Sequence, residues 1–246
     1  MLDHSAEIVQ LARTLRLPML AKYKEYIKNG ATFEEGLLQL LEIELSERER
    51  KSIERKMKNA GFPIIKTIDT WVPNRLPNFD ESNITKLLTC DFIKEKRNCI
   101  AIGNSGTGKS HILIAIGVEA IRKGYTVKFK KAHQLVTEMS EAQDAKKLSR
   151  YLKALNNNQI LLIDELGYLS FDTEGASLLF QVLAERYETK STFITTNLEF
   201  SKWVDFLGDP MLSTALIDRL AHKSTFLNMK GPSFRLENAE QFTKIL

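Results

Sequence analysis

Eight consecutive residues near the middle of the chain have the composition of a phosphate-binding loop. The run Gly103-Asn104-Ser105-Gly106-Thr107-Gly108-Lys109-Ser110 fits the pattern G-x-x-x-x-G-K-[ST]. Glycines let the backbone curve around phosphate oxygens, so that successive N–H groups point at negative charge. Lys109 is then expected to meet the β- and γ-phosphates, and the Ser110 hydroxyl to complete the ligand shell of a Mg²⁺ ion. We call residues 103–110 the phosphate loop and predict that it binds a nucleoside triphosphate.

The residues on either side of the phosphate loop supply the elements that would position it. Residues 99–102 form a short apolar run typical of a strand, and the spacing of Ile112, Ile116 and Ile121 predicts a helix. The alternative interpretation is an ordinary glycine-rich turn. A strand, a glycine loop and a helix in this order favour the nucleotide site.

Two acidic residues follow a second apolar run, residues 160–163. Asp164, at the tip of a buried strand, is expected to hold the Mg²⁺ shell, usually through water. Glu165 beside it is positioned to orient and deprotonate an attacking water. The alternative is a strand that merely ends in solvated carboxylates, but an acidic pair after a phosphate loop favours a catalytic site.

Three further residues are candidates for the same site. Asn197 follows the strand predicted at residues 192–195, and parallel strands present their carboxyl ends to one crevice. We therefore expect Asn197 near Glu165, where it could fix the lytic water; a turn-forming asparagine is the alternative. Arg219 and Arg235 could stabilise the charge that develops on a cleaved γ-phosphate, from a neighbouring subunit if necessary, although spacing alone does not select them.

Strand and helix patterns alternate through the second part of the chain, which predicts an α/β fold with a doubly wound parallel sheet. Before it the pattern is helical, and Thr32-x-x-Glu35 is a capping box that opens a long helix. Pro-rich residues 62–97 are expected to pack Trp71 and Phe79 on the following domain. We predict a helical domain over residues 1–64 and an ATPase domain over residues 65–246.

Composition excludes several other classes of protein. The 246 residues contain no apolar run of the roughly 18 that a membrane span needs, and the N-terminus lacks a signal-peptide core. With only two cysteines, neither a disulfide framework nor a four-cysteine zinc site is indicated, and we expect a cytoplasmic protein. A formal charge of +4 permits nucleic-acid binding without requiring it.

Basic residues gather in and beside the segment between the second predicted strand and Asp164. They would make sequence-tolerant, salt-sensitive contacts with the phosphates of duplex DNA, or they form a solvated helix face. The seven residues are Lys128, Lys130, Lys131, Lys146, Lys147, Arg150 and Lys153.

These motifs together resemble a known family. The order phosphate loop, Ile-Asp-Glu, Thr-Thr-Asn, Asp218-Arg219-Leu220 and Gly231-Pro232-Ser233-Phe234-Arg235 is similar to that of AAA+ ATPases of the helicase-loader type. Within that group the chain most resembles the IstB-like transposition helper proteins. The N-terminal stretches that carry this likeness are residues 17–23, 42–44 and 55–63, with residues 66–68 resembling the entry into the ATPase domain.

The resemblance implies a role for each candidate residue. By this resemblance, Lys109 and Ser110 have the phosphate-loop roles, and Ser110 and Asp164 bind the Mg²⁺ ion. Glu165 is the catalytic base. Asn197 corresponds to the first sensor, Arg219 to the finger offered to a neighbouring subunit's nucleotide, and Arg235 to the second sensor. Only eleven residues follow Arg235, too few for the usual helical lid, which agrees with the lidless transposition helpers.

The resemblance also implies a function. An ATP-dependent oligomer binds duplex DNA without strong sequence preference, recruits and activates a transposase, and dissolves when ATP is hydrolysed. One alternative is a loader whose partner is a replicative helicase, since such loaders share the ATPase motifs. A small-molecule kinase is the alternative from another class, but it would need an acceptor pocket and a lid.

Overall fold

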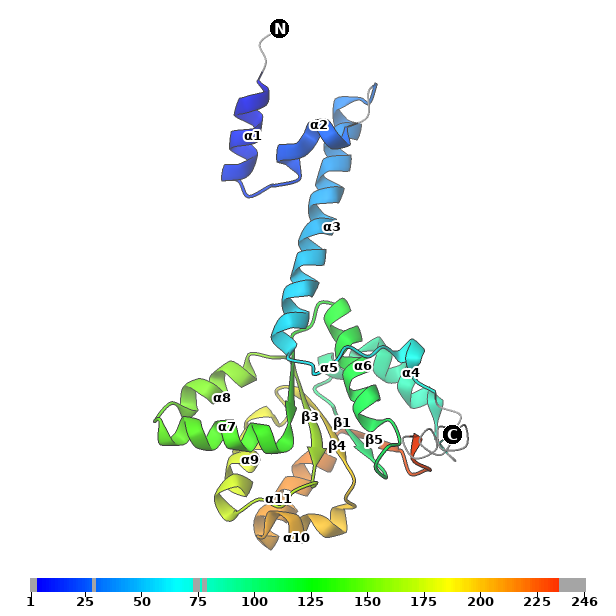
Figure 1. Ribbon diagram of the computed structural model, residues 1–246, viewed down its shortest axis with the longest axis vertical. Coiled ribbons are helices and arrows are strands. Elements are labelled where there is room, and N and C mark those ends of the chain that lie inside the picture. Colours follow the sequence, from blue (N-terminus) through cyan, green and yellow to red (C-terminus); the bar gives the residue numbers. More distant parts are fainter. Residues whose placement is uncertain (1–3, 28–29, 73–75, 77–78, 235–246) are drawn as a thin grey trace, which may run out of the picture. The chain divides into compact units, whose positions relative to one another are not determined.

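A computed structural model describes residues 4–27, 30–72, 76 and 79–234 of the chain (Figure 1). The chain divides into two compact units, residues 1–55 and residues 56–246. Helix α3 (Phe33–Ala60) contains the point of division. The domain boundary expected between residues 64 and 65 stays a prediction.

The first unit is helical, as expected. The predicted capping box is formed at the start of α3, because Thr32 N donates to Glu35 Oε2 at 2.9 Å and Glu35 N donates to Thr32 Oγ1 at 3.3 Å. Further along α3 the buried Glu44 accepts the backbone N–H of Met19 at 2.9 Å. The elements before α3 are α1 (Ser5–Thr14), the 3₁₀ turn η1 (Leu20–Lys22) and α2 (Tyr23–Tyr26).

The second unit is built on a five-stranded sheet in the order β2-β3-β4-β1-β5, and every neighbouring pair is parallel. This confirms the predicted parallel α/β fold. The central strands have continuous buried runs because helices cover both of their faces. The strands are β1 (Asn98–Ile102), β2 (Val127–Lys131), β3 (Ile160–Leu166), β4 (Ser191–Thr196) and β5 (Ser224–Asn228).

Helix α6 (Lys109–Arg122) lies on one face of this sheet, against β2, β3 and β4. Gly117 lets it approach closely, since a Cβ there would lie 2.6 Å from Leu162 Cδ1 of β3. Helices on the other face include α7 (Ala132–Asp144), α8 (Leu148–Asn156), α9 (Thr173–Arg186), α10 (Trp203–Leu207) and α11 (Pro210–Ala221). Before β1 lie the 3₁₀ turn η2 (Ile68–Thr70), α4 (Glu81–Thr89) and α5 (Asp91–Lys94).

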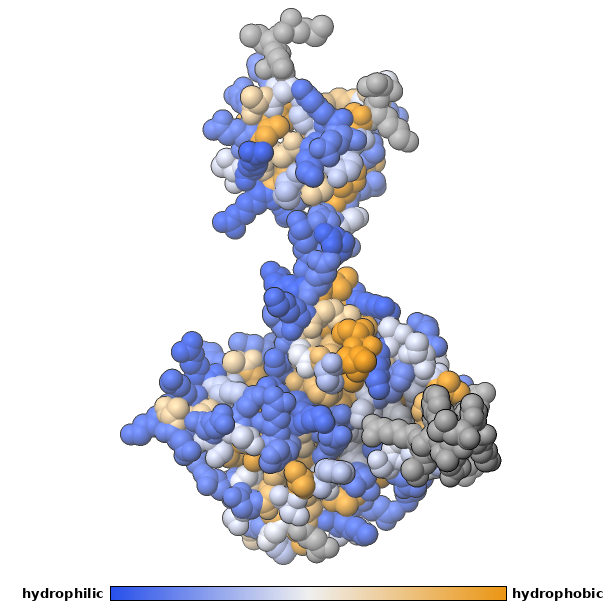
Figure 2. Space-filling model, in the orientation of Figure 1, coloured by the Kyte–Doolittle hydropathy of each residue, from blue (hydrophilic) through white to orange (hydrophobic). Residues whose placement is uncertain are grey.

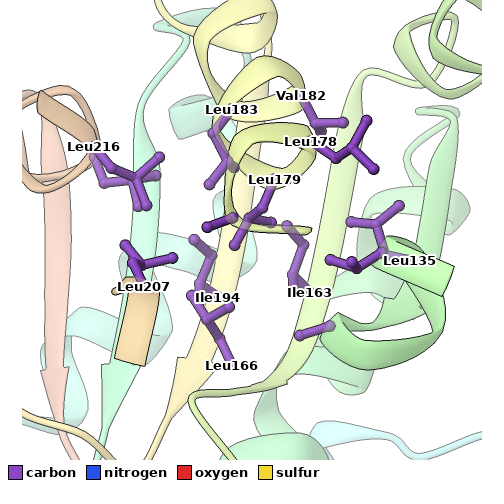
Figure 3. Packing of buried hydrophobic residues seen from close by; sticks show 14 of the residues in the cluster. Leu135, Ile163, Leu166, Leu178, Leu179, Val182, Leu183, Ile194, Leu207 and Leu216 are labelled. Atoms are coloured by element: carbon purple, nitrogen blue, oxygen red, sulfur yellow. The ribbon is translucent and has the colours of Figure 1, made fainter. Parts of the chain in front are cut away.

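A cluster of buried hydrophobic residues fills the space between the sheet and α9 (Figure 3). Leu179 of α9 packs over Ile163 of β3 and Ile194 of β4, and all three side chains are fully buried. This packing holds β3 and β4 in place up to their carboxyl ends, where the polar residues of the predicted site begin. None of the helices in the described part of the chain has the length and apolar content of a membrane-spanning segment.

Candidate nucleotide-binding site

The phosphate loop joins β1 to α6, as the sequence predicts. Gly106 has a φ of +80° and Gly108 a φ of +90°, in the left-handed region that only glycine adopts readily. At Gly103 the constraint is close approach, since a Cβ there would lie 2.1 Å from the carbonyl oxygen of Met229. A larger residue at any of these three positions would therefore disturb the backbone of the loop.

The side chain of Lys109 folds back on this loop. Its Nζ donates to the carbonyl oxygens of Gly103 at 2.7 Å and of Asn104 at 2.6 Å. Thr107 Oγ1 donates to the same Asn104 carbonyl at 2.9 Å. The ammonium is thus held beside the curve of backbone that would receive phosphate oxygens.

Ser110 and Asp164 meet at the first turn of α6. Ser110 Oγ donates to Asp164 Oδ1 at 2.9 Å, and the Asp164 carboxylate is buried. Hydroxyl and carboxylate oxygens are hard ligands of the kind that Mg²⁺ prefers, and here they lie side by side next to the loop. The two residues therefore fit the Mg²⁺ site expected from the sequence.

Glu165 projects from an irregular part of β3. The pairing of β3 with β4 shifts between Ile163 and Leu166, and Glu165 has a φ of +62°, rare for a residue with a side chain. Its side chain is 43% exposed, and Oε2 lies 2.8 Å from Nζ of Lys131 at the end of β2. The carboxylate is therefore open to water, and its cationic neighbour is a residue that the sequence analysis expected at a DNA contact or on a solvated helix face.

Lys109, Ser110 and Glu165 line a cavity of about 320 Å³, a volume in the range of small-molecule sites. Glu165 and Asn197 both line it together with the phosphate loop, as expected from the shared edge of parallel strands. The segment before β1 also lines it, with apolar Trp71, Val72 and Leu76 beside polar Lys66 and Thr70. Trp71 packs edge-on against Phe79, with ring centroids 5.3 Å apart. The sequence predicted these two aromatic anchors but not the place of Trp71 in the cavity wall.

The two candidate arginines are placed differently. Arg219 on α11 does not line this cavity; its Cζ lies 5.0 Å from the centroid of the Phe180 ring on α9, and Nη1 donates to the carbonyl of Ala215 at 3.1 Å. Arg235 and the predicted absence of a lid fall outside the described residues. The segment before it reaches the loop, where Phe234 N donates to Gly106 O at 3.1 Å.

The seven basic residues form two groups. Lys128 Nζ donates to the carbonyl of Asn59 at 2.9 Å. Lys130 is paired with both carboxylate oxygens of Glu138 at 2.6 Å. Lys131 forms an ion pair with Glu165. These three lysines therefore already have partners within the protein.

The other four lie just before α8 and along it, and hydrophilic residues cover much of the surface over α7 and α8 (Figure 2). Leu152 and Leu155 turn the apolar side of α8 into the core, so its basic side faces solvent. Within the part of the chain that the structure describes, no partner is recorded for these four exposed side chains, Lys146, Lys147, Arg150 and Lys153.

Comparison with solved structures identifies the fold. The DnaC helicase loader matches with a TM-score of 0.54 at 21% identity, over 68% of this chain and 96% of that one. The replication initiator DnaA, bound to AMPPCP and single-stranded DNA, gives a TM-score of 0.52 at 19% identity, over 65% and 49% of the two chains. About two thirds of the chain therefore shares the fold of these two proteins; at these identities the likeness shows nothing further.

Comparison of sequences identifies the family. An ATP-binding protein of insertion sequence IS5376 from Geobacillus stearothermophilus is 40% identical over 93% of both chains. An ATP-binding protein of insertion sequence IS21 from Pseudomonas aeruginosa is 34% identical over 94% of this chain and 89% of its own. The family described as IstB-like ATP binding protein matches residues 10–242. The chain belongs to the IstB-like ATP-binding proteins associated with insertion sequences.

Proposed function

We propose that the cavity is the active site of a Mg²⁺-dependent ATPase. The observation that carries the proposal is the 2.9 Å contact of Ser110 with Asp164, directly beside the exposed carboxylate of Glu165. Ser110 and Asp164 would hold Mg²⁺, which neutralises charge on the β- and γ-phosphates when it is bound. Lys109 binds the same phosphates, Glu165 accepts the proton of the attacking water, and Asn197 fixes that water.

In this proposal each site is completed by a neighbouring subunit. Arg219 is half-exposed and does not line the cavity of its own chain, which supports a role at another molecule's nucleotide. An arginine placed there stabilises the charge that spreads over the γ-phosphate oxygens during cleavage. Arg235 is the second arginine that we assign to the nucleotide.

Mixing two inactive variants tests this arrangement. Lys109→Ala subunits keep Arg219, and Arg219→Ala subunits keep an intact phosphate loop, so a mixed assembly contains some complete sites. ATP hydrolysis should reappear on mixing and peak near equal amounts. No recovery at any ratio, with both variants still assembling, would count against an arginine acting between subunits.

We further propose that ATP assembles the protein on duplex DNA, without strong sequence preference, in the cytoplasm. The exposed basic residues around α8 support this role, because phosphate contacts carry no base information. A complete switch between dissociated and assembled states needs a bias of about 5.5 kcal/mol from ATP. Hydrolysis removes that bias and lets the assembly dissolve.

The names of the relatives, which belong to insertion sequences, support a transposase as the protein partner. We propose that the assembly recruits and activates that transposase at the target DNA. The fold shared with the DnaC loader favours a second candidate, the loading of a replicative helicase. Co-purification from cells decides between them, since a transposase supports the first role and a helicase the second.

A further inference from the structure

We propose that the hydroxyl of Thr195 positions both acidic residues of the active site. This inference rests on the ATPase function proposed above. Thr195 lies on β4 and is almost completely buried. Its Oγ1 donates to Asp164 Oδ1 and accepts the backbone N–H of Glu165, with an N–O distance of 3.0 Å.

The pairing of β3 with β4 explains why a hydroxyl is needed there. Ile163 pairs with Ile194 and Leu166 pairs with Thr196, so two residues of β3 lie opposite the single residue Thr195. Such a bulge interrupts the regular ladder of backbone hydrogen bonds. The N–H of Glu165 finds its acceptor in the Thr195 side chain instead, and without it a backbone donor beside a buried carboxylate would lose its partner.

The same hydroxyl acts on the two acids in different ways. It donates to the Asp164 oxygen that also accepts Ser110 Oγ, and two donors on one oxygen fix the rotation of the carboxylate. By accepting from Glu165 N, it holds the left-handed backbone turn that directs the Glu165 side chain into the cavity. A hydroxyl can donate and accept at once, which valine cannot do and serine can.

Thr195→Val and Thr195→Ser therefore form a matched pair. Valine keeps the shape of threonine and removes the hydroxyl, whereas serine keeps the hydroxyl. Because small misplacements of catalytic groups cost up to about 100-fold in rate, we expect Thr195→Val to lower kcat by about 10- to 100-fold. Its affinity for ATP measured without Mg²⁺ should stay within about 3-fold of the wild type, because the phosphate loop is untouched. Thr195→Ser should retain most of kcat.

Thr192→Val is the control on the same strand. Thr192 is also buried, but its Oγ1 accepts Nε of Arg186 at 3.2 Å, at the opposite end of β4. Removing this hydroxyl tests whether any buried hydroxyl of β4 matters for turnover. We expect the kcat of Thr192→Val to equal that of the wild type.

Hydrogen exchange gives a readout that does not depend on activity. The amide of Glu165 should be protected in the wild type and in Thr195→Ser, and should exchange at least about 10-fold faster in Thr195→Val. An unprotected Glu165 amide in the wild type would overturn the proposal, even if Thr195→Val failed to fold. Equal loss of kcat in the serine and valine variants would overturn it as well. If the wild type had no ATPase activity, the proposed function would be wrong, and the exchange rates would still test the hydrogen bond from Glu165 N to Thr195.

Discussion

The basic surface at α8 makes a quantitative prediction for DNA binding. A quadruple variant replaces its four exposed basic residues, Lys146, Lys147, Arg150 and Lys153, with alanine. Their neighbours on the apolar side of the helix stay unchanged, so α8 should keep its packing. The variant therefore removes charge from the surface without removing its support.

The magnitude follows from counterion release. Each cation that neutralises a DNA phosphate contributes about 0.9 to the slope of log affinity against log salt concentration, so four contacts contribute about 3.6. Between 50 and 200 mM salt, that slope corresponds to an affinity change of about 150-fold. The DNA affinity of the wild type should fall by at least this factor over this range of salt concentration. The slope for the quadruple variant should be smaller by about 3.6.

Fluorescence anisotropy with a labelled duplex and ATP measures both slopes. Lys128→Met is the matched control, because the Lys128 ammonium is engaged with the carbonyl of Asn59 and burial lowers its pKa. Its slope should equal that of the wild type. An unchanged slope in the quadruple variant, or an equal decrease in Lys128→Met, would refute the assignment of DNA contacts to the four exposed residues.

Four further predictions concern the fold that supports the site. Leu179→Ala should lower the free energy of unfolding by about 2–5 kcal/mol in a urea titration, because Leu179 is fully buried between α9 and the sheet. Asp209→Ala should cost about 1 kcal/mol in the same titration, since Asp209 caps α11 by accepting two backbone N–H groups, and Asp209→Asn should retain most of that stability. Burial raises the pKa of Cys90 to about 11 and also raises that of Cys99, so both thiols should resist iodoacetamide at pH 8 until the chain unfolds. A raised thiol pKa in the folded state also means that stability is lost as pH rises from about 8.5, where the unfolded thiols ionise, through 11.

The parts of the site that were predicted from the sequence depend on local patterns. The phosphate loop and the acidic pair each occupy a few consecutive residues, and their flanking strands and helix follow from hydrophobic periodicity. Asn197 was expected beside Glu165 because the carboxyl ends of parallel strands share an edge, and both residues line the same cavity. The roles assigned to these residues stay predictions.

The parts that were missed depend on contacts between distant residues. Thr195 belongs to the Thr-Thr-Asn run that carries the family resemblance, but its proposed role depends on a register shift between two strands that no local pattern specifies. Lys131 was grouped with DNA-binding residues, and its ion pair with Glu165 depends on the pairing of β2 with β3. Trp71 was expected to pack, but only the tertiary path of its segment brings it to the cavity wall.

The chemistry of Glu165 is the central claim, and one substitution tests it most directly. Glu165→Gln keeps the size and shape of the side chain while it removes the base, so single-turnover measurements with radiolabelled ATP should give bound nucleotide with hydrolysis slowed by about 100-fold or more. The same variant should keep the ATP-bound assembly on duplex DNA, visible as persistent complexes in native electrophoresis. Hydrolysis at the wild-type rate by Glu165→Gln, with ATP bound normally, would contradict the assigned base.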